Sequence, residues 1–140
     1  MLYLLQMIEQ PSPQSSDCLG TLHPMAIQGI MLFNRGEYWD AHEALEEAWR
    51  EEAGEVRYLY QGILQVGVAY LHIQRGNFNG ALKLHKRAHR WLDPFPPQCR
   101  GIDVARLKAD LDAAITEVRR LGPIQLTNFN PALFKPVYIS

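Results

Sequence analysis

A histidine and two carboxylates follow one another closely in the sequence, and they are the side chains best suited to chemistry. They are His42, Glu43 and Glu46. Because His42 and Glu46 are four residues apart, a helix places them on one side, where both can reach the same ion or substrate. Burial beside an aromatic ring raises the proton affinity of a carboxylate, and histidine titrates near neutral pH. The pattern therefore indicates either an acid/base site or a metal site.

The known metal-binding motifs are incomplete at this position. The zincin motif has histidine where this chain has Glu46, and the di-iron bundle motif has glutamate where this chain has Trp39. We therefore expect no metal and no cofactor. If a metal were bound, His42 and Glu46 would be its ligands, with Glu43 or His72 completing the shell.

Catalysis is the second hypothesis for these residues. Glu43, Glu46 and His42 are the catalytic candidates, and the enzyme would be a metal-dependent or acid/base hydrolase. The sequence shows no nucleophile next to a base and no glycine-rich phosphate loop. Whether the chain is an enzyme therefore stays open.

The helix that must carry these residues is predicted over residues 37–52. Gly36 ends the preceding helix, and neither glycine nor proline interrupts the run that follows. At about 100° per residue, one face of this helix is apolar and includes Trp49. His42, Glu43 and Glu46 lie with Trp39 on the flank of that face, where clefts form.

A third helix, from about residue 55 to residue 73, is apolar on nearly every side, which is typical of a helix surrounded by others. Its glycines, Gly62 and Gly67, indicate close approach of a neighbouring helix. Its polar residues Gln61, Gln65 and His72 fall within roughly 40° of one another and form a single stripe.

The polar stripe should meet polar partners on the preceding helix. An unpaired buried amide costs on the order of 1–3 kcal/mol, so Gln61 and Gln65 need hydrogen bonds. We expect Glu43 or Glu46, with His42 or His72, to supply them across the interface of the second and third helices. Such a network could be structural only, fixing the register of the helices.

A binding module is the function that we favour, with a groove for a peptide or a partner helix and with Trp39 and Trp49 as anchors. The partner would be an unknown protein or peptide. The predicted binding residues are Trp39, His42, Glu43, Glu46, Trp49, Gln61, Gln65 and His72.

Helical periodicity continues through the rest of the chain and predicts an all-α fold. Further helices are expected over residues 22–34, 78–92 and 104–121. We therefore predict a single-domain bundle of about five helices over residues 22–122. Residues 1–21 are expected to form a flexible or loosely packed arm, and residues 123–140 an extended strap that lies on the bundle or grips a second copy in a homodimer.

An internal repeat relates two parts of the bundle. The segment from Phe33 to Ala41 returns forty residues later, from Ile73 to Ala81, with the same Arg-Gly turn followed by an aromatic residue. This repeat predicts two stacked helical hairpins with tetratricopeptide-like pairing. Two units are fewer than a solenoid usually needs, so a closed bundle is favoured.

Composition limits the remaining possibilities. The chain has 140 residues, 47% of them hydrophobic, and a net charge of -1, which suits one domain with a real core and does not favour nucleic-acid binding. Acidic residues concentrate in residues 37–55 and basic residues in residues 75–100, so these segments should face each other. The apolar N-terminus is too short to span a membrane.

The two cysteines bear on the compartment. Cys18 and Cys99 are far apart and match no metal motif, so we expect free thiols, no zinc site and a reducing, cytoplasmic location.

Several of these motifs together resemble a known family. His42-Glu43-Ala-Leu-Glu46-x-x-Trp49 is followed by Gln61-Gly-x-x-Gln65, by His72, and by Gly76-Asn77 and Gly80-Ala81. This order is similar to the HExLExxW family catalogued as domain of unknown function 309. The resemblance spans roughly residues 29–92. It implies a helical bundle and a polar cluster, and it carries no established activity.

Overall fold

The structure is a computed structural model in which residues 11–140 are described. Five α-helices carry the fold, and the described chain has one two-stranded sheet. The helices are α2 (Pro24–Asn34), α3 (Tyr38–Glu51), α4 (Arg57–Gln74), α5 (Phe78–Leu92) and α6 (Val104–Leu121). The strands are β1 (Gln98–Cys99) and β2 (Ile102–Asp103), and the 3₁₀ helices are η1 (Ser15–Cys18), η2 (Leu126–Asn128) and η3 (Pro131–Leu133). The predicted all-α bundle is confirmed.

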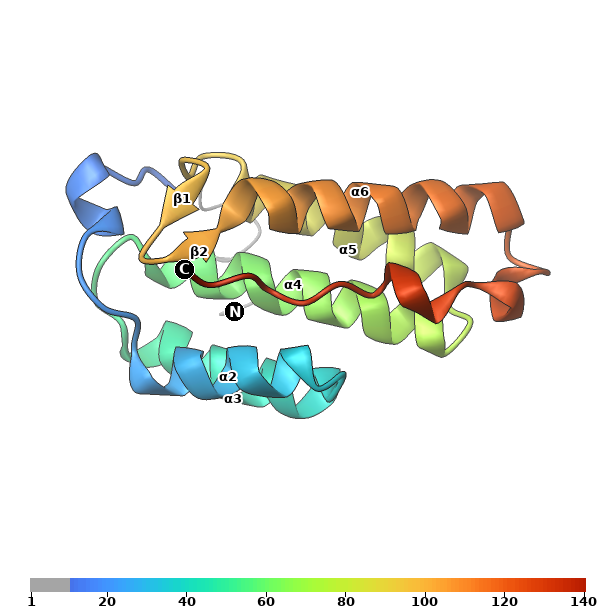
Figure 1. Cartoon of the computed structure of the whole chain (residues 1–140), viewed down its shortest axis with the longest axis horizontal. Coiled ribbons are helices and arrows are strands. Elements are labelled where there is room, and N and C mark those ends of the chain that lie inside the picture. The colour runs from blue at the N-terminus through green and yellow to red at the C-terminus, as the bar shows by residue number, and fades with distance from the viewer. Residues whose placement is uncertain (1–10) are drawn as a thin grey trace, which may run out of the picture.

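Each long helix packs against the next one in the chain. Figure 1 shows the hairpin of α2 and α3 below α4, with α6 above α4 and α5 behind α6. Residues on nearly every side of α4 are buried, including Leu59, Tyr60, Ile63 and Tyr70. The helix α4, which is the third helix predicted from the sequence, is therefore the core element, as its sequence predicts.

The repeated turns have the same backbone geometry. Gly36 and Gly76 adopt positive φ angles of 80° and 72°, which glycine tolerates best. After Gly36 the amide of Glu37 donates to the carbonyl of Leu32 at 3.0 Å, and after Gly76 the amide of Asn77 donates to His72 at 2.8 Å. Both turns are Schellman motifs, so the repeat corresponds to two equivalent helical hairpins. Tetratricopeptide-like pairing of these hairpins stays a prediction.

Close contact between α4 and α5 depends on Gly62. A Cβ atom at Gly62 would lie 2.4 Å from Cδ2 of Leu92 and 2.6 Å from its Cγ. Gly67 is less tight, since its Cβ would lie 3.2 Å from Cδ2 of Phe33. The predicted close approach is therefore confirmed at Gly62, where nothing larger than hydrogen fits without movement of a fully buried leucine.

The substitution Gly62→Ala should lower the free energy of unfolding. The overpacking against Leu92 costs about 1–3 kcal/mol, whereas alanine gains only about 1 kcal/mol in helix propensity. Urea unfolding followed by circular dichroism measures the difference. Gly54→Ala is the control, because a Cβ there meets nothing within 4 Å. If Gly62→Ala is instead more stable than the wild type by about 1 kcal/mol, as helix propensity alone predicts, α4 and α5 do not pack as described.

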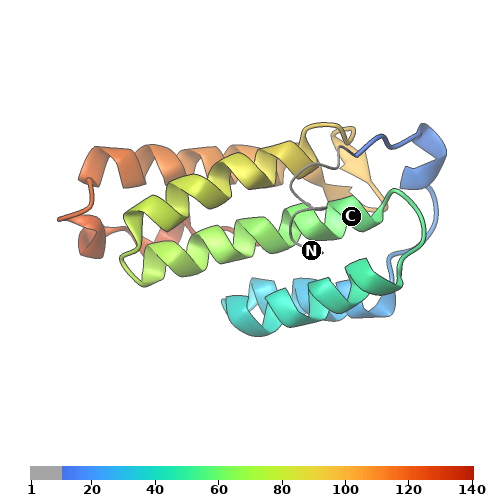
Figure 2. The same ribbon diagram turned by 180° about the vertical axis from the view of Figure 1, so that it is seen from behind.

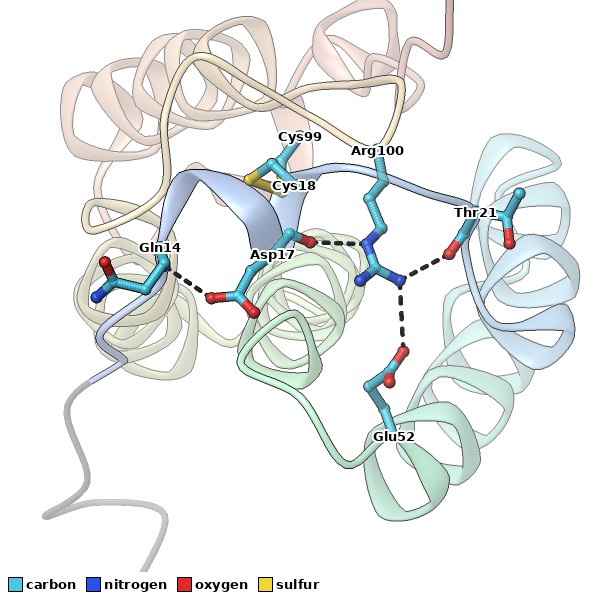
Figure 3. Close-up of a disulfide and its surroundings, with 7 residues drawn as sticks. All are labelled: Gln14, Asp17, Cys18, Thr21, Glu52, Cys99 and Arg100. Carbon is cyan, nitrogen blue, oxygen red and sulfur yellow. Dashed lines mark hydrogen bonds and ion pairs between the residues drawn. A yellow bond between two sulfur atoms is a disulfide. The ribbon is translucent and has the colours of Figure 1, made fainter.

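The segment before α2 is fixed to the bundle over its described part. Cys18 in η1 forms a disulfide with Cys99 in β1, 81 residues away (Figure 3). The prediction of free thiols is therefore wrong, because the fold brings together cysteines that the sequence separates. Residues 11–21 belong to the predicted flexible or loosely packed arm, and the disulfide ties this part to the bundle; residues 1–10 of the arm lie outside the described part of the chain.

Arg100 adds a polar tie beside the disulfide. Its Nε donates to the carbonyl oxygen of Asp17 at 2.7 Å, and its Nη1 donates to that of Thr21 at 2.7 Å (Figure 3). Its Nη1 also lies 3.8 Å from Oε1 of Glu52, just beyond the end of α3. Backbone groups of the N-terminal segment are thereby paired with the loop that joins β1 and β2. The Arg100–Glu52 pair also joins the predicted acidic and basic segments.

Breaking the disulfide should destabilise the protein. For a loop of this length the chain-entropy account gives about 4–5 kcal/mol. We expect Cys18→Ala to unfold at a lower urea concentration than the oxidised wild type. Under reducing conditions the two proteins should have similar urea midpoints, because neither then has the disulfide. Alkylation followed by mass spectrometry gives an independent check. Two reactive thiols in the unreduced native protein would contradict the disulfide.

The C-terminal segment lies along the bundle as an extended strap, seen in red beside α4 and α6 in Figure 1. Asn34 at the end of α2 exchanges two hydrogen bonds with the backbone of Val137, at 2.8 and 3.1 Å. The ring of Phe134 packs on Tyr38 and Tyr70. The strap therefore uses these residues within its own chain. The homodimer predicted as the alternative stays a prediction.

Candidate functional site

The cleft between α3, α4 and α5 gathers most of the predicted site residues. It encloses about 550 Å³. Figure 2 shows these three helices in front of α6, on the side of α4 away from the strap. The lining residues are Trp39, His42, Glu46, Gln61, Leu64, Gln65, Val68, His72, Asn77, Gly80, Lys83, Leu84 and Arg87.

The α3 wall presents an aromatic pair and an ion pair. The rings of Trp39 and His42 stack with their centroids 5.1 Å apart and 19° between the ring planes. His42 Nε2 lies 3.4 Å from Oε2 of Glu46, and Arg50 Nη2 lies 3.0 Å from Oε1 of the same glutamate. The spacing of one turn between these residues brings them together, as the sequence predicts. Trp39 is 52% exposed and reaches furthest into solvent.

The floor of the cleft is the polar stripe of α4. Gln61 and Gln65 are 4% and 8% exposed, and they are the buried polar residues of the described chain. Their Oε1 atoms have no hydrogen-bond partner among residues 11–140. The predicted hydrogen-bonded network therefore does not form through these oxygens. An ionised carboxylate accepts hydrogen bonds and donates none, so Glu46 cannot pair with these oxygens, and it accepts a hydrogen bond from Arg50 instead.

Two predicted site residues lie elsewhere. Glu43 is exposed and lines a separate hollow with Asp40 and Glu47 on another side of α3. Trp49 is only 3% exposed, and the guanidinium of Arg57 covers its ring at 4.6 Å. The prediction that Trp49 anchors a partner is therefore wrong, because its position on the apolar face places the ring in the core.

His72 closes one end of the cleft, where it is held by the second hairpin turn. Its Nδ1 lies 3.1 Å from Nδ2 of Asn77, whose Oδ1 accepts the amide of Gly80 at 2.9 Å. A Cβ at Gly80 would lie 2.9 Å from Cγ of His72, so a larger residue at position 80 would displace the imidazole ring. Burial, with a further contribution from the charge of Arg75, lowers the pKa of His72 below its usual range.

The sequence analysis did not predict that α5 forms one wall of the site. It consists of Gly80, Lys83, Leu84 and Arg87, on one side of α5. The hairpin repeat predicts that α5 packs beside α4, and the three- and four-residue spacing marks a single helix face. These two signals together could have identified Lys83 and Arg87.

The structure does not complete the predicted metal shell. Among residues 11–140, no third histidine, cysteine or carboxylate places a ligand atom within 4.8 Å of both His42 and Glu46. Glu43 faces away, and His72 is engaged by Asn77. In the described chain, a single group of three such residues has its ligand atoms within 4.8 Å of one another, and that group lies between α5 and α6.

The lowered pKa of His72 gives a pH dependence with a definite sign. Its unfolded-state pKa is about 6.5. Below that pH the unfolded chain takes up a proton more readily than the native state, so His72 destabilises the fold progressively as the pH falls toward its native pKa. The NMR titration midpoint of the His72 ring should lie below 6.5 and should rise in Arg75→Gln, where an exposed charge is removed. A midpoint at or above 6.5 would contradict the described burial.

Comparison with known proteins agrees with the motifs. Residues 26–84 match the family described as "Domain of unknown function (DUF309)". A protein of Aquifex aeolicus (strain VF5), named "Uncharacterized protein", is 28% identical over 86 residues. The match covers 59% of this chain, and the chain spans 25% of that protein. Within residues 11–140, no helix has the length and apolar character needed to cross a membrane.

The family match runs from α2 into α5 and ends at Leu84. It includes every residue that lines the cleft except Arg87. The resemblance of the chain to the domain of unknown function 309 family, predicted from its motifs, is therefore confirmed over residues 26–84.

Proposed function

We propose that this chain is a binding module whose cleft between α3, α4 and α5 holds a short peptide segment of a partner protein. The observation that carries the proposal is the composition of the cleft walls. An exposed tryptophan lies on one wall, two cationic side chains lie on the other, and buried carboxamides form the floor. Peptide-binding grooves combine such apolar anchors with a few polar groups.

The apolar part of the cleft favours an aromatic or aliphatic side chain. Leu64 and Val68 of α4 and Leu84 of α5 lie in it beside the ring of Trp39. Trp39 lies against His42 and is still half exposed, so a partner side chain can cover the ring without unfolding any part of the bundle. Exposed tryptophans of this kind are often the residues that dominate binding energy.

The charged part favours an acidic side chain. Lys83 and Arg87 are one turn apart on α5, and Lys83 makes no ion pair with another described residue. The carboxylate of Glu46, on the opposite wall, is already neutralised by Arg50. A peptide that carries an acidic residue next to an apolar one therefore complements both walls.

The glutamine floor can adapt to a peptide backbone. A carboxamide carries both a donor and an acceptor, and rotation about its last bond exchanges their positions. Since the Oε1 atoms of Gln61 and Gln65 have no partner within residues 11–140, this rotation breaks no hydrogen bond at either oxygen. A ligand amide that pairs with them would relieve a cost on the order of 1–3 kcal/mol for each unpaired group.

The alternative is the acid/base or metal-dependent hydrolase. It keeps His42 and Glu46, which lie 3.4 Å apart at the cleft, and loses Glu43, which faces another side. The cleft is lined by no serine, threonine or cysteine of the described chain. Such an enzyme would have to activate a water molecule instead of a protein nucleophile.

Selection from a random peptide library displayed on phage tests the proposal. We expect selected peptides to pair an acidic residue with an aromatic or aliphatic one and to change the fluorescence of Trp39, since Trp49 and Trp91 are buried. Trp39→Ala should weaken binding at least about 30-fold, which corresponds to a loss of about 2 kcal/mol. Lys83→Glu should weaken the acidic peptides by repulsion.

Lys86→Glu is the matched control, because Lys86 is an exposed lysine of α5 outside the cleft. It should bind the same peptides within about twofold, since exposed charges interact weakly at a distance in salt. Peptides that bind Trp39→Ala as well as wild type would contradict the proposal. Turnover in a hydrolase screen that Glu46→Gln abolishes, with no peptide selected, would favour the enzyme.

A further inference from the structure

Two histidines and an aspartate converge where α5 packs on α6. His85 and His89 are one turn apart on α5, and Asp112 lies opposite them on α6. His85 Nε2 is 2.8 Å from Oδ1 of Asp112, and His89 Nε2 is 2.6 Å from the same oxygen. Within residues 11–140, no other group of three histidines, cysteines or carboxylates brings its ligand atoms within 4.8 Å of one another.

The convergence has the form of a metal site. Zinc binds imidazole nitrogen at about 2.0–2.1 Å, so tetrahedral ligand atoms lie about 3.3 Å apart. The nitrogen-to-oxygen distances at Asp112 are shorter than this, and a small rotation of the carboxylate would open them. Such a rotation is feasible because the Asp112 side chain is 51% exposed, whereas the histidines are more restrained at 20% and 26%.

A further carboxylate orients one of the histidines. Nδ1 of His89 lies 2.8 Å from Oδ1 of Asp93, which leaves Nε2 directed at Asp112. Lys108 Nζ lies 3.4 Å from the same Asp93 oxygen. Metal-binding histidines commonly have such a carboxylate on their other nitrogen, where it fixes the ring and makes the ligand more basic.

We propose that His85, His89 and Asp112 bind a divalent transition-metal ion of the zinc class, which clamps α5 to α6. Two imidazoles and one carboxylate favour such ions over magnesium or calcium, which prefer oxygen ligands. Three protein ligands leave a fourth tetrahedral position, which water can fill on the exposed side of Asp112. This site is separate from the cleft and does not depend on the proposed peptide binding.

Without metal, the same residues can form an ion-pair network. Burial lowers the pKa of His89, but its hydrogen bonds to Asp112 and Asp93 outweigh this effect, so the pKa of His89 is raised overall. A protonated His89 would then bridge two carboxylates with no ion present. This ion-pair network is the competing interpretation of the cluster, and a measurement of zinc binding distinguishes it from the metal site.

Isothermal titration of the chelator-treated full chain with zinc chloride tests the proposal. We expect one zinc ion per chain, a thermal midpoint that rises with zinc concentration, and no comparable effect of magnesium. Cobalt(II) should bind with the visible absorption of a site of low coordination number. Asp112→Asn, a change at an exposed residue, should weaken zinc binding more than about 10-fold, and Asp93→Asn should weaken it by about 10-fold or more through His89.

His42→Gln is the matched control, because it removes a histidine from the cleft and leaves the α5–α6 cluster intact. It should retain stoichiometric zinc binding. His85→Gln gives a second ligand variant, with circular dichroism to show that it folds. Zinc binding that survives Asp112→Asn and His85→Gln, or that is lost only in His42→Gln, overturns the proposal. A folded wild-type protein that takes up no zinc or cobalt does so too and favours the ion-pair network.

Discussion

Burial of α4 on three of its sides is the constraint on which the other elements depend. The helix is apolar almost all round, so it must be surrounded, and the neighbouring segments divide its surface among them. The hairpin of α2 and α3 covers one side, and α5 packs on another, with Leu92 in contact at Gly62. The strap reaches Tyr70 through Phe134. The side that carries Gln61, Gln65 and His72 is the one that faces the cleft.

The cleft is therefore a consequence of how the core helix is covered. If the side of α4 that carries Gln61, Gln65 and His72 were apolar, another helix would have to cover it. If that side were fully polar, α4 would pack less tightly in the core. Two buried carboxamides bounded by Leu64 and Val68 are a compromise that leaves a hollow lined by both kinds of surface. Gln61 and Gln65 line this hollow, and their Oε1 atoms have no partner among residues 11–140, so water or a ligand can pair with them.

Periodicity predicted the helices well because it is local. The fold class and the α3 and α4 sides of the cleft follow from residues within a few turns of one another, such as His42 with Glu46 and Gln61 with Gln65. Predictions that needed the rotation of one helix against another were less reliable. Trp49 lies on the apolar face of α3, and this position predicts burial in the core more strongly than the residue type predicts a binding anchor. Glu43 is next to His42 in sequence and yet faces a different side.

Contacts across long separations were not predictable from the sequence. Cys18 and Cys99 are 81 residues apart, and only the path of the segment before α2 brings them together. Disulfides persist in oxidising compartments and inside hyperthermophiles, so the expected reducing cytoplasm no longer follows from the cysteines. The cluster of His85, His89 and Asp112 was missed for the same reason. Its two histidines are one turn apart, but nothing local indicates that Asp112 of α6 lies opposite them.

The two proposed sites share α5 and use opposite sides of it. Lys83 and Arg87 face the cleft, whereas His85 and His89 face α6. Two residues along a helix correspond to a rotation of about 200°, so the cationic wall and the imidazole pair are back to back. The packing of α5 against α6 is less extensive than its packing against α4. The packing of α5 against α4, with Leu92 on Gly62, therefore does most to hold Lys83 and Arg87 at the cleft, and a metal bound by His85, His89 and Asp112 would add a tie on the opposite side of α5.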